Sequence, residues 1–339
     1  MPPARSARLA PLLRLKAAEL AQFRVELDRL HDAYNVPDST ADPVQFVWRY
    51  DDPRDREVVA AIASGLAFGR LASVLASIER VLALLGPRPA AYIDALDVRE
   101  AREALAPVVH RWTRGDDLVA LLVVLRTLRA RHGSLEGAFL AGDDPASEDV
   151  APGLEAFCAA ACGVDVREAY GGASRGLPAE AASEASGQRR LGRLGVHYFF
   201  PKPSLGSACK RLNLFVRWMV RQDAVDPGGW TGVSRARLVI PLDTHTIRVG
   251  RCLRLTRYTS PGWRMAADIT ATLRRIDPDD PVRYDFSLCH MSMMGACGHG
   301  KKVGSSQCPL QGFCRPGKTS DKGHVRQSPG RQGTGDQDG

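Results

Sequence analysis

A lysine and an aspartate in the second half of the chain, Lys210 and Asp243, are the residues best suited to chemistry. Asp243 stands where an apolar run, residues 238–242, gives way to an amphipathic helix. A carboxylate there can cap the helix and stay ionised at its positive end. Lys210 lies in the first turn of another expected helix, where the ammonium form is destabilised and the amine becomes a better nucleophile. Such a pair could perform covalent chemistry at a sugar C1′ carbon.

Lysine is scarce in this chain, which makes Lys210 informative. The sequence contains seven lysines against thirty-nine arginines. Arginine stays protonated in proteins, whereas a lysine can be deprotonated, so a lysine at this position indicates a need for a neutral amine. A solvated lysine on a helix face is the alternative interpretation.

The segments around both residues resemble the helix-hairpin-helix DNA glycosylase superfamily, which includes endonuclease III. Leu242-Asp243-Thr244-His245 with Arg248-Val249 matches the string that holds the family's catalytic aspartate. Gly206, Lys210 and Asn213 match its hairpin, with Ala208 in place of the second glycine. The chain also resembles a bacterial family of uncharacterised conserved proteins, from about Asp42 through Phe286. The glycosylase resemblance implies that Lys210 and Asp243 are the catalytic residues.

One departure concerns the connection between the two motifs. Residues 222–230 make it longer than in endonuclease III. A comparably long connection resembles the archaeal 8-oxoguanine glycosylase branch. The base preference of neither relative is therefore carried over.

The resemblance implies a base-excision repair glycosylase that is also an AP lyase. Neutral Lys210 would attack C1′ and form a Schiff base, and β-elimination would follow. Asp243 would stabilise the cationic sugar and assist the deprotonation of Lys210. The sequence does not identify the base that is removed, although oxidised bases are candidates. It also leaves RNA open as a substrate. Two other functions stay open: a DNA-binding module without chemistry, and a metal-sensing protein built on an iron–sulfur or zinc site.

Basic charge concentrated around this pair predicts a polyanionic ligand. Residues 187–264 contain fifteen Lys and Arg against three acidic residues, whereas the whole chain has a net charge of +8. The implied partner is double-stranded DNA, held through its phosphates. An arginine-rich genome is the alternative explanation. The expected DNA contacts are Gly206, Ser207, Ala208, Arg211, Arg70, Arg217 and His245. Candidates for base stacking are Phe68, Trp218, Trp230 and Trp263.

Cysteines near the C-terminus could hold a metal. Cys308 and Cys314 resemble the last two ligands of the [4Fe–4S] loop in endonuclease III-type enzymes, and Cys297 precedes them. Ser305 stands where that loop has another cysteine, so Cys289 could be the fourth ligand only if the last helix bends back. A cluster, a zinc site using His290 or His299, and a loop without metal all remain open. A reducing cytosol argues against structural disulfides.

Helices must position these residues, and the expected fold class is all-α, with two helical lobes. Apolar residues at helical spacing predict helices over residues 14–33, 57–68, 72–85, 116–132, 154–162, 261–276 and 281–294. The one strand signal is the run 238–240. We expect one domain over residues 1–316, with a flexible insertion at about 165–190 and a cysteine loop at 289–314. Residues 317–339 should be a disordered tail.

Hydropathy predicts no association with a membrane. No apolar stretch reaches the length of about 18 residues that a membrane-spanning helix needs. Arg5, Arg8 and Arg14 interrupt any signal-peptide core. We therefore expect a cytoplasmic, nucleoid-associated monomer.

Overall fold

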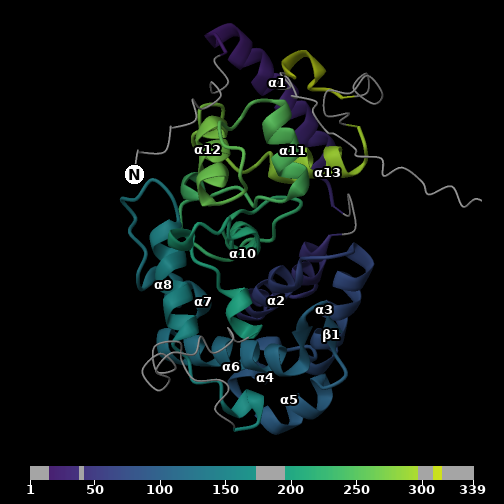
Figure 1. Ribbon diagram of the computed structural model, residues 1–339, viewed down its shortest axis with the longest axis vertical. Helices are drawn as coiled ribbons and strands as arrows, with labels where there is room; N and C mark the ends of the chain where they lie inside the picture. Colours follow the sequence, from purple (N-terminus) through teal and green to yellow (C-terminus); the bar gives the residue numbers. More distant parts are fainter. Residues whose placement is uncertain (1–14, 38–41, 173–194, 297–307, 315–339) are drawn as a thin grey trace, which may run out of the picture.

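Helices form almost all of the regular structure in the computed structural model, which describes residues 15–37, 42–172, 195–296 and 308–314. They gather into two groups in Figure 1, with α10 (Lys210–Val220) between them. The lower group contains α2 (Pro53–Leu66), α3 (Leu71–Leu85), α4 (Pro89–Asp94), α5 (Val98–Leu105), α6 (Gly115–His132), α7 (Leu135–Leu140) and α8 (Ala151–Cys162). The upper group contains α1 (Ala17–Tyr34), α11 (Thr244–Cys252), α12 (Trp263–Arg274) and α13 (Asp285–Met293).

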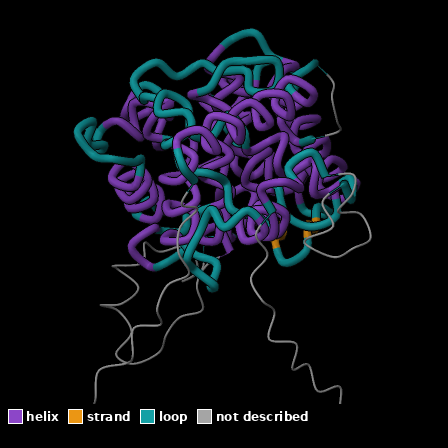
Figure 2. The backbone as a smooth tube through the Cα atoms, turned by 90° about the horizontal axis from the view of Figure 1, so that it is seen from above, coloured by secondary structure: helices purple, strands orange, loops and turns teal. Residues whose placement is uncertain are grey.

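Short 3₁₀ turns connect these helices. They are η1 (Pro43–Arg49), η2 (Glu168–Tyr170), η3 (Gly195–Phe199), η4 (Pro203–Leu205), η5 (Arg235–Arg237) and η6 (Gln311–Phe313). Seen from above in Figure 2, helix dominates the described part of the tube, where strand is confined to one short hairpin. The expected all-α class is confirmed at this level of description.

Local sequence accounts for the helices that form the lower group. At α2, Asp52 accepts a hydrogen bond from the Arg54 N–H at 2.9 Å, and Pro53 occupies the first helical position. Every residue from 117 to 125 in α6 is buried. A helix that is apolar on all sides belongs in a core, so α6 lies at the centre of its group. Helix α2 also packs against α10, which joins the two groups.

Helix α1, from the start of the chain, completes the upper group. Helix α1 packs against α13, and the Tyr284 hydroxyl donates to Asp28 at 2.8 Å. The segment 308–314 lies beside them, since the Phe313 ring is 4.8 Å from that of Phe23. Residues far apart in sequence therefore build the upper group together.

The only strand pair among the described residues lies elsewhere than expected. β1 (Val109–His110) and β2 (Thr113–Arg114) pair antiparallel, with Val109 opposite Arg114 and His110 opposite Thr113. Residues 238–240 are buried but form no strand, and the Ile240 N–H donates to Thr270 Oγ1 at 3.0 Å. The expectation of a strand there was wrong because the apolar run reflects burial against a helix.

Part of the expected flexible insertion is ordered. Residues 165–172 include η2, where the Tyr170 hydroxyl donates to Asp117 at 2.7 Å. Residues 173–194 and the expected tail at 317–339 lie outside the described residues. None of the helices described here is both long and apolar enough to cross a membrane.

Candidate active site

Asp243 caps helix α11, as its sequence position predicts. Its Oδ1 accepts hydrogen bonds from the backbone N–H groups of His245 and Thr246, both at 2.8 Å. The residues before it, 238–242, are buried and hold the start of the helix in place. One carboxylate oxygen is therefore committed to the cap, which leaves Oδ2 for other partners.

Oδ2 of Asp243 faces Lys210, which lies thirty-three residues earlier in the sequence. Lys210 Nζ is 4.0 Å from Oδ2, and the two side chains are 34% and 18% exposed. Nζ also donates to the Ala67 carbonyl oxygen at 3.4 Å. Burial would raise the pKa of Asp243, but the Lys210 charge and the Thr246 N–H outweigh it, so the pKa lies below its usual value. The carboxylate is thus held ionised next to an amine that solvent can still reach.

The hairpin before α10 sets the direction of Lys210. Gly206 has a φ of +80°, and its carbonyl accepts from the Trp263 N–H at 3.3 Å, which ties the turn to α12. Cys209, also left-handed at φ 48°, precedes the helix, and its N–H donates to Ser207 Oγ at 3.2 Å. The buried Asn213 amide donates to the Ala208 carbonyl at 3.1 Å. This network explains why Gly206 and Asn213 accompany Lys210 in the sequence.

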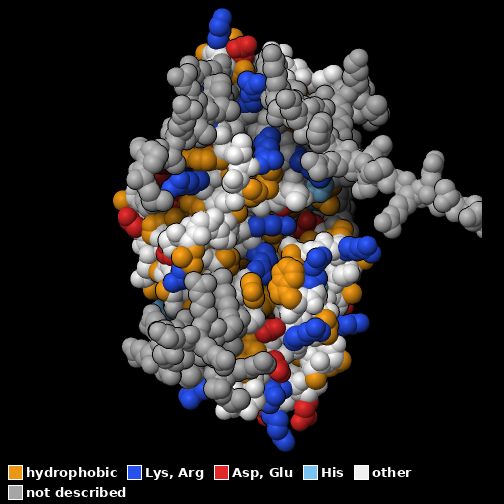
Figure 3. Space-filling view, viewed as in Figure 1, with side chains coloured by type: hydrophobic (Ala, Val, Ile, Leu, Met, Phe, Trp, Pro, Cys, Tyr) orange, Lys and Arg blue, Asp and Glu red, His pale blue; other side chains and the backbone are white. Residues whose placement is uncertain are grey.

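An open cavity of about 560 Å³ adjoins the amine. Its wall combines the end of α2, the segment after η3 and the hairpin, and it is lined by Ala67, Phe68, Tyr198, Pro201, Lys202 and residues 205–211. No carboxylate occurs among these lining residues. On the face shown in Figure 3, Lys and Arg side chains gather across the middle of the molecule with hydrophobic side chains between them. The cavity is suited to an anionic ligand that also has an apolar surface.

Arg211 has a structural role that the sequence did not predict. Its guanidinium donates to the carbonyl oxygens of Gly65, at 2.9 Å, and Tyr198. It also lies over the rings of Phe68 and Phe199, at 5.1 and 5.5 Å. Burial lowers the pKa of Arg211 to about 10. Arg211 therefore braces the cavity wall with two of its N–H donors, a role that differs from the phosphate contact we expected.

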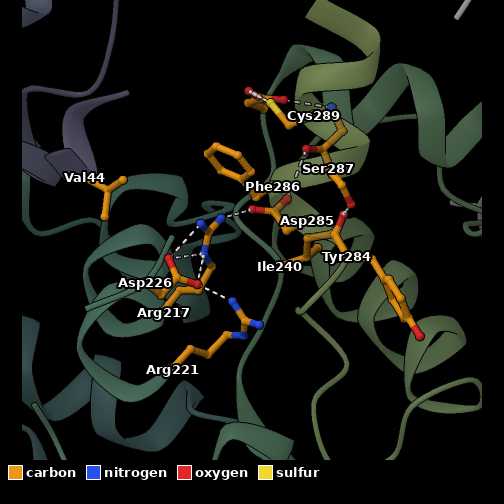
Figure 4. A network of polar contacts seen from close by, with 12 residues as sticks. Val44, Arg217, Arg221, Asp226, Ile240, Tyr284, Asp285, Phe286, Ser287 and Cys289 are labelled. Atoms are coloured by element: carbon orange, nitrogen blue, oxygen red, sulfur yellow. Dashed lines mark hydrogen bonds and ion pairs between the residues drawn. The ribbon is translucent and has the colours of Figure 1, made fainter. Parts of the chain in front are cut away.

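Arg217 is not available for the DNA contact that we expected of it. Its side chain is 3% exposed and pairs with Asp226 at 2.8 Å and Asp285 at 2.6 Å. Figure 4 shows its guanidinium between these carboxylates, and Arg221 joins the same network through Asp226 and Asp280. The counter-ions of Arg217 are Asp226, in the connection formed by residues 222–230, and Asp285, in α13. The concentration of basic residues in this segment is thus partly an internal feature.

The other expected DNA contacts lie at or near the surface. Gly206 is exposed, whereas Ser207 and Ala208 are half-buried in the hairpin. Arg70 is exposed immediately before α3. The His245 ring faces α13, with Nδ1 3.2 Å from Ser292 Oγ. DNA contacts by these residues stay predictions.

Among the expected stacking residues, Phe68 alone lines the cavity. Trp218 and Trp230 are buried, and the Trp230 ring donates to Glu57 at 2.9 Å. Trp263 begins α12 and lines a different cavity. The exposed Trp112 and Tyr198 were missed, because an isolated aromatic residue in a turn carries no periodic signal.

Two of the cysteines expected to hold a metal, Cys289 and Cys314, lie apart from each other in the described part of the chain. Cys314 forms a disulfide with Cys252 at the end of α11, with Cα atoms 5.5 Å apart. The Cys289 thiol donates to Asp243, at the opposite end of the same helix, at 3.3 Å. Nine residues of helix span about 13 Å, too far for Cys289 and Cys314 to ligate one cubane cluster. We expected no structural disulfide, and the Cys252–Cys314 pair departs from that expectation.

Cys308 is half-buried, whereas Cys297 and His299 lie outside the described residues. His290 is buried against the backbone, with Nδ1 2.8 Å from the Phe286 carbonyl. Within the described ranges, no three or more His, Cys, Asp or Glu side chains form a possible metal site. A cluster or zinc site in the cysteine loop therefore stays a prediction, and no chemistry is assigned to it.

A family model described as "Protein of unknown function (DUF2400)" matches residues 42–294. The chain belongs to the DUF2400 family. No curated protein and no solved structure matches it. The DUF2400 match starts at Asp42 and contains both Lys210 and Asp243. The expected membership of an uncharacterised family is thereby confirmed, whereas this match makes no link to the helix-hairpin-helix glycosylases.

Proposed function

We propose that this DUF2400 protein is a DNA glycosylase with AP-lyase activity. The observation that supports the proposal best is the contact between Lys210 and Asp243, at 4.0 Å, where two helices start beside an open cavity. A half-exposed amine beside an ionised carboxylate has the composition that Schiff-base chemistry on a sugar requires. A purely structural ion pair would not need a cavity next to its amine.

The reaction uses the two residues in different roles. The neutral amine of Lys210 attacks C1′, the bond from C1′ to the base breaks, and the base leaves with the bonding electrons and takes up a proton. Loss of the proton on nitrogen and ring opening produce the Schiff base. Removal of a C2′ proton then expels the 3′ phosphate, and water releases Lys210. The Lys210 charge and the cap hold Asp243 ionised until Lys210 gives up its proton, and the carboxylate then stabilises the positive charge on the sugar as it develops.

The partner that fits this chemistry is double-stranded DNA with a damaged base. The nucleotide has to leave the helix to reach Lys210, which costs a few kcal/mol and least at a lesion. The lining lysines, Lys202 and Lys210, supply positive charge to the cavity, and the exposed Arg70 follows two residues after Phe68 of its wall. Phosphate contacts of this type weaken as salt rises, because bound counterions are released.

Borohydride trapping on a panel of lesion duplexes tests the proposal. The wild type should form a covalent adduct on an accepted lesion, and Lys210→Gln should form none. Lys202→Gln is the matched control, because Lys202 lines the same cavity but forms no ion pair with Asp243 within 4.0 Å. Equal trapping by Lys210→Gln and the wild type would exclude Lys210 as the nucleophile. DNA binding without trapping on any lesion would favour the alternative of a non-catalytic DNA-binding module.

A further inference from the structure

Three aromatic side chains from separate segments form an exposed surface next to the cavity. Trp112, in the turn between β1 and β2, is 54% exposed, and Tyr198 in η3 is 45% exposed. The Trp112 ring is stacked on that of Phe68, with centroids 4.7 Å apart and planes 23° apart. The Tyr198 ring is 6.5 Å from Trp112. We call Phe68, Trp112 and Tyr198 the aromatic platform.

Contacts with His110 and Arg211 hold the aromatic platform in position. His110, on the strand that leads to Trp112, is buried, with Nε2 2.9 Å from the Phe68 carbonyl and Nδ1 3.0 Å from Ser77 Oγ. Its ring also meets that of Phe68 edge-on at 4.6 Å. Arg211 covers another part of Phe68 and donates to the Tyr198 backbone. The three rings thus keep their relative positions without a ligand, which lowers the entropy cost of binding one.

Positively charged side chains lie near the platform. The Arg111 guanidinium lies 5.6 Å from the centre of the Trp112 ring, and its side chain packs beside Gly69, where an added Cβ would meet Arg111 Cδ at 3.2 Å. Arg70 follows directly and is exposed. Phe68 and Tyr198 themselves line the cavity that contains Lys202 and Lys210. A ligand with flat, apolar faces and regularly spaced negative charges would complement both features.

Nucleic acid has this combination, but only an unpaired base can present its face. Inside a duplex, both faces of each base are covered by its neighbours, whereas a single strand can stack its bases on exposed aromatic side chains. We propose that the aromatic platform binds an unpaired nucleobase. The protein therefore prefers DNA with a single-stranded stretch over a continuous duplex. The position of the reacting nucleotide at Lys210 rests on the proposed function, whereas the stacking itself does not.

Fluorescence anisotropy with a short labelled oligo-dT, and with a blunt duplex of the same length and label, tests this inference. At one salt concentration, the wild-type protein should bind oligo-dT more tightly than the duplex. Trp112→Ala should weaken oligo-dT binding by about 5- to 100-fold, the effect of losing one base–aromatic stack. Trp112→Phe should restore most of the affinity. Val109→Ala is the matched control, because Val109 is an exposed residue of the same hairpin and lies outside the aromatic platform.

The outcomes separate the platform from the chemistry. Lys210→Gln should weaken oligo-dT binding less than Trp112→Ala does, because it removes one positive charge from the adjoining cavity but leaves the three rings in place. Equal oligo-dT affinity of Trp112→Ala and the wild type would overturn the inference, as would tighter binding of the duplex by the wild type. If no lesion is trapped while Trp112→Ala loses oligo-dT binding, the platform stands and the glycosylase proposal fails. Because Trp112 is largely exposed, its replacement should leave the unfolding midpoint almost unchanged, which circular dichroism verifies.

Discussion

Cys289 donates its thiol hydrogen to Oδ2 of Asp243, the same carboxylate oxygen that lies 4.0 Å from Nζ of Lys210. Helix α13 brings Cys289 there because it packs against α11. Burial and the nearby Asp243 charge raise the pKa of the Cys289 thiol, so it stays protonated and remains a donor. The hydrogen bond in turn helps to hold the pKa of Asp243 down. Cys289 is thus a positioning residue for Asp243, and this contact uses it differently from the metal ligand that its sequence suggests.

Replacing Cys289 should shift the acidic side of the profile of reaction rate against pH. Cys289→Ala removes a donor to Asp243, so the pKa of Asp243 should rise and trapping should decline at a higher pH than in the wild type. Cys289→Ser keeps a donor and should restore the wild-type profile. The measurement is the rate of adduct formation as the pH is lowered toward and below about 3.9, the usual pKa of an aspartate. An unchanged profile in Cys289→Ala would mean that the thiol only fills space.

Asp243→Asn separates the cap from the charge. The amide oxygen can still accept from the His245 and Thr246 N–H groups, so stability should fall by less than the roughly 0.5–2 kcal/mol that losing a cap costs. The rate of base release should fall by about a hundredfold or more, as for other preorganised charges. Base release is measured beside a melting curve of the same protein. Near-normal turnover in a stable variant would leave Asp243 as a helix cap only.

Arg217 should matter for stability, because it lies inside the protein. Arg217→Ala leaves Asp285 without its ion-pair partner and Asp226 with Arg221 alone, and breaking a buried pair in this way typically costs about 3–5 kcal/mol of unfolding free energy. Arg54→Ala is the control, since Arg54 forms an exposed pair with Asp52. That variant should unfold at nearly the wild-type urea concentration. Similar midpoints for both variants would contradict the assignment of Arg217 to the core.

Sequence predicted the features that depend on neighbouring residues. Asp243 accepts from N–H groups two and three residues later, so a few consecutive residues are enough to predict its cap. The start of α2 is similar, with Asp52 and Pro53 together. Long helices such as α6 have enough turns to show a pattern, whereas α4 and α7, with six residues each, do not. Those two short helices were missed for that reason.

Features that depend on distant partners were not predictable. Arg217 was expected on the surface because its partner Asp285 is 68 residues away, and nothing in either local string shows the pairing. Trp112 and Phe68 likewise meet only in the folded chain. The pairing of Lys210 with Asp243 was anticipated only because a family resemblance suggested it.

The buried carboxyl of Asp285 should make stability depend on pH in a way that can be isolated. Burial raises its pKa to about 7, which the Arg217 charge opposes and the Asp243 charge reinforces. In the unfolded chain this group titrates at about 3.9. The folded protein therefore binds the proton more tightly, so this contribution to stability is fully present below about pH 4. It is lost progressively as the pH rises to about 7.

Asp285→Asn removes the titration while keeping an oxygen that can accept from Arg217. Urea unfolding of both proteins should show the wild type losing stability relative to the variant between about pH 4 and pH 7, by an amount on the order of a few kcal/mol. Above about pH 7 the difference should become constant. Neighbouring carboxyls such as Asp226 and Asp280 are present in both proteins, so the comparison removes most of their contribution. A difference that stays constant over the whole range would mean that Asp285 is ionised throughout and that Arg217 fully compensates its burial.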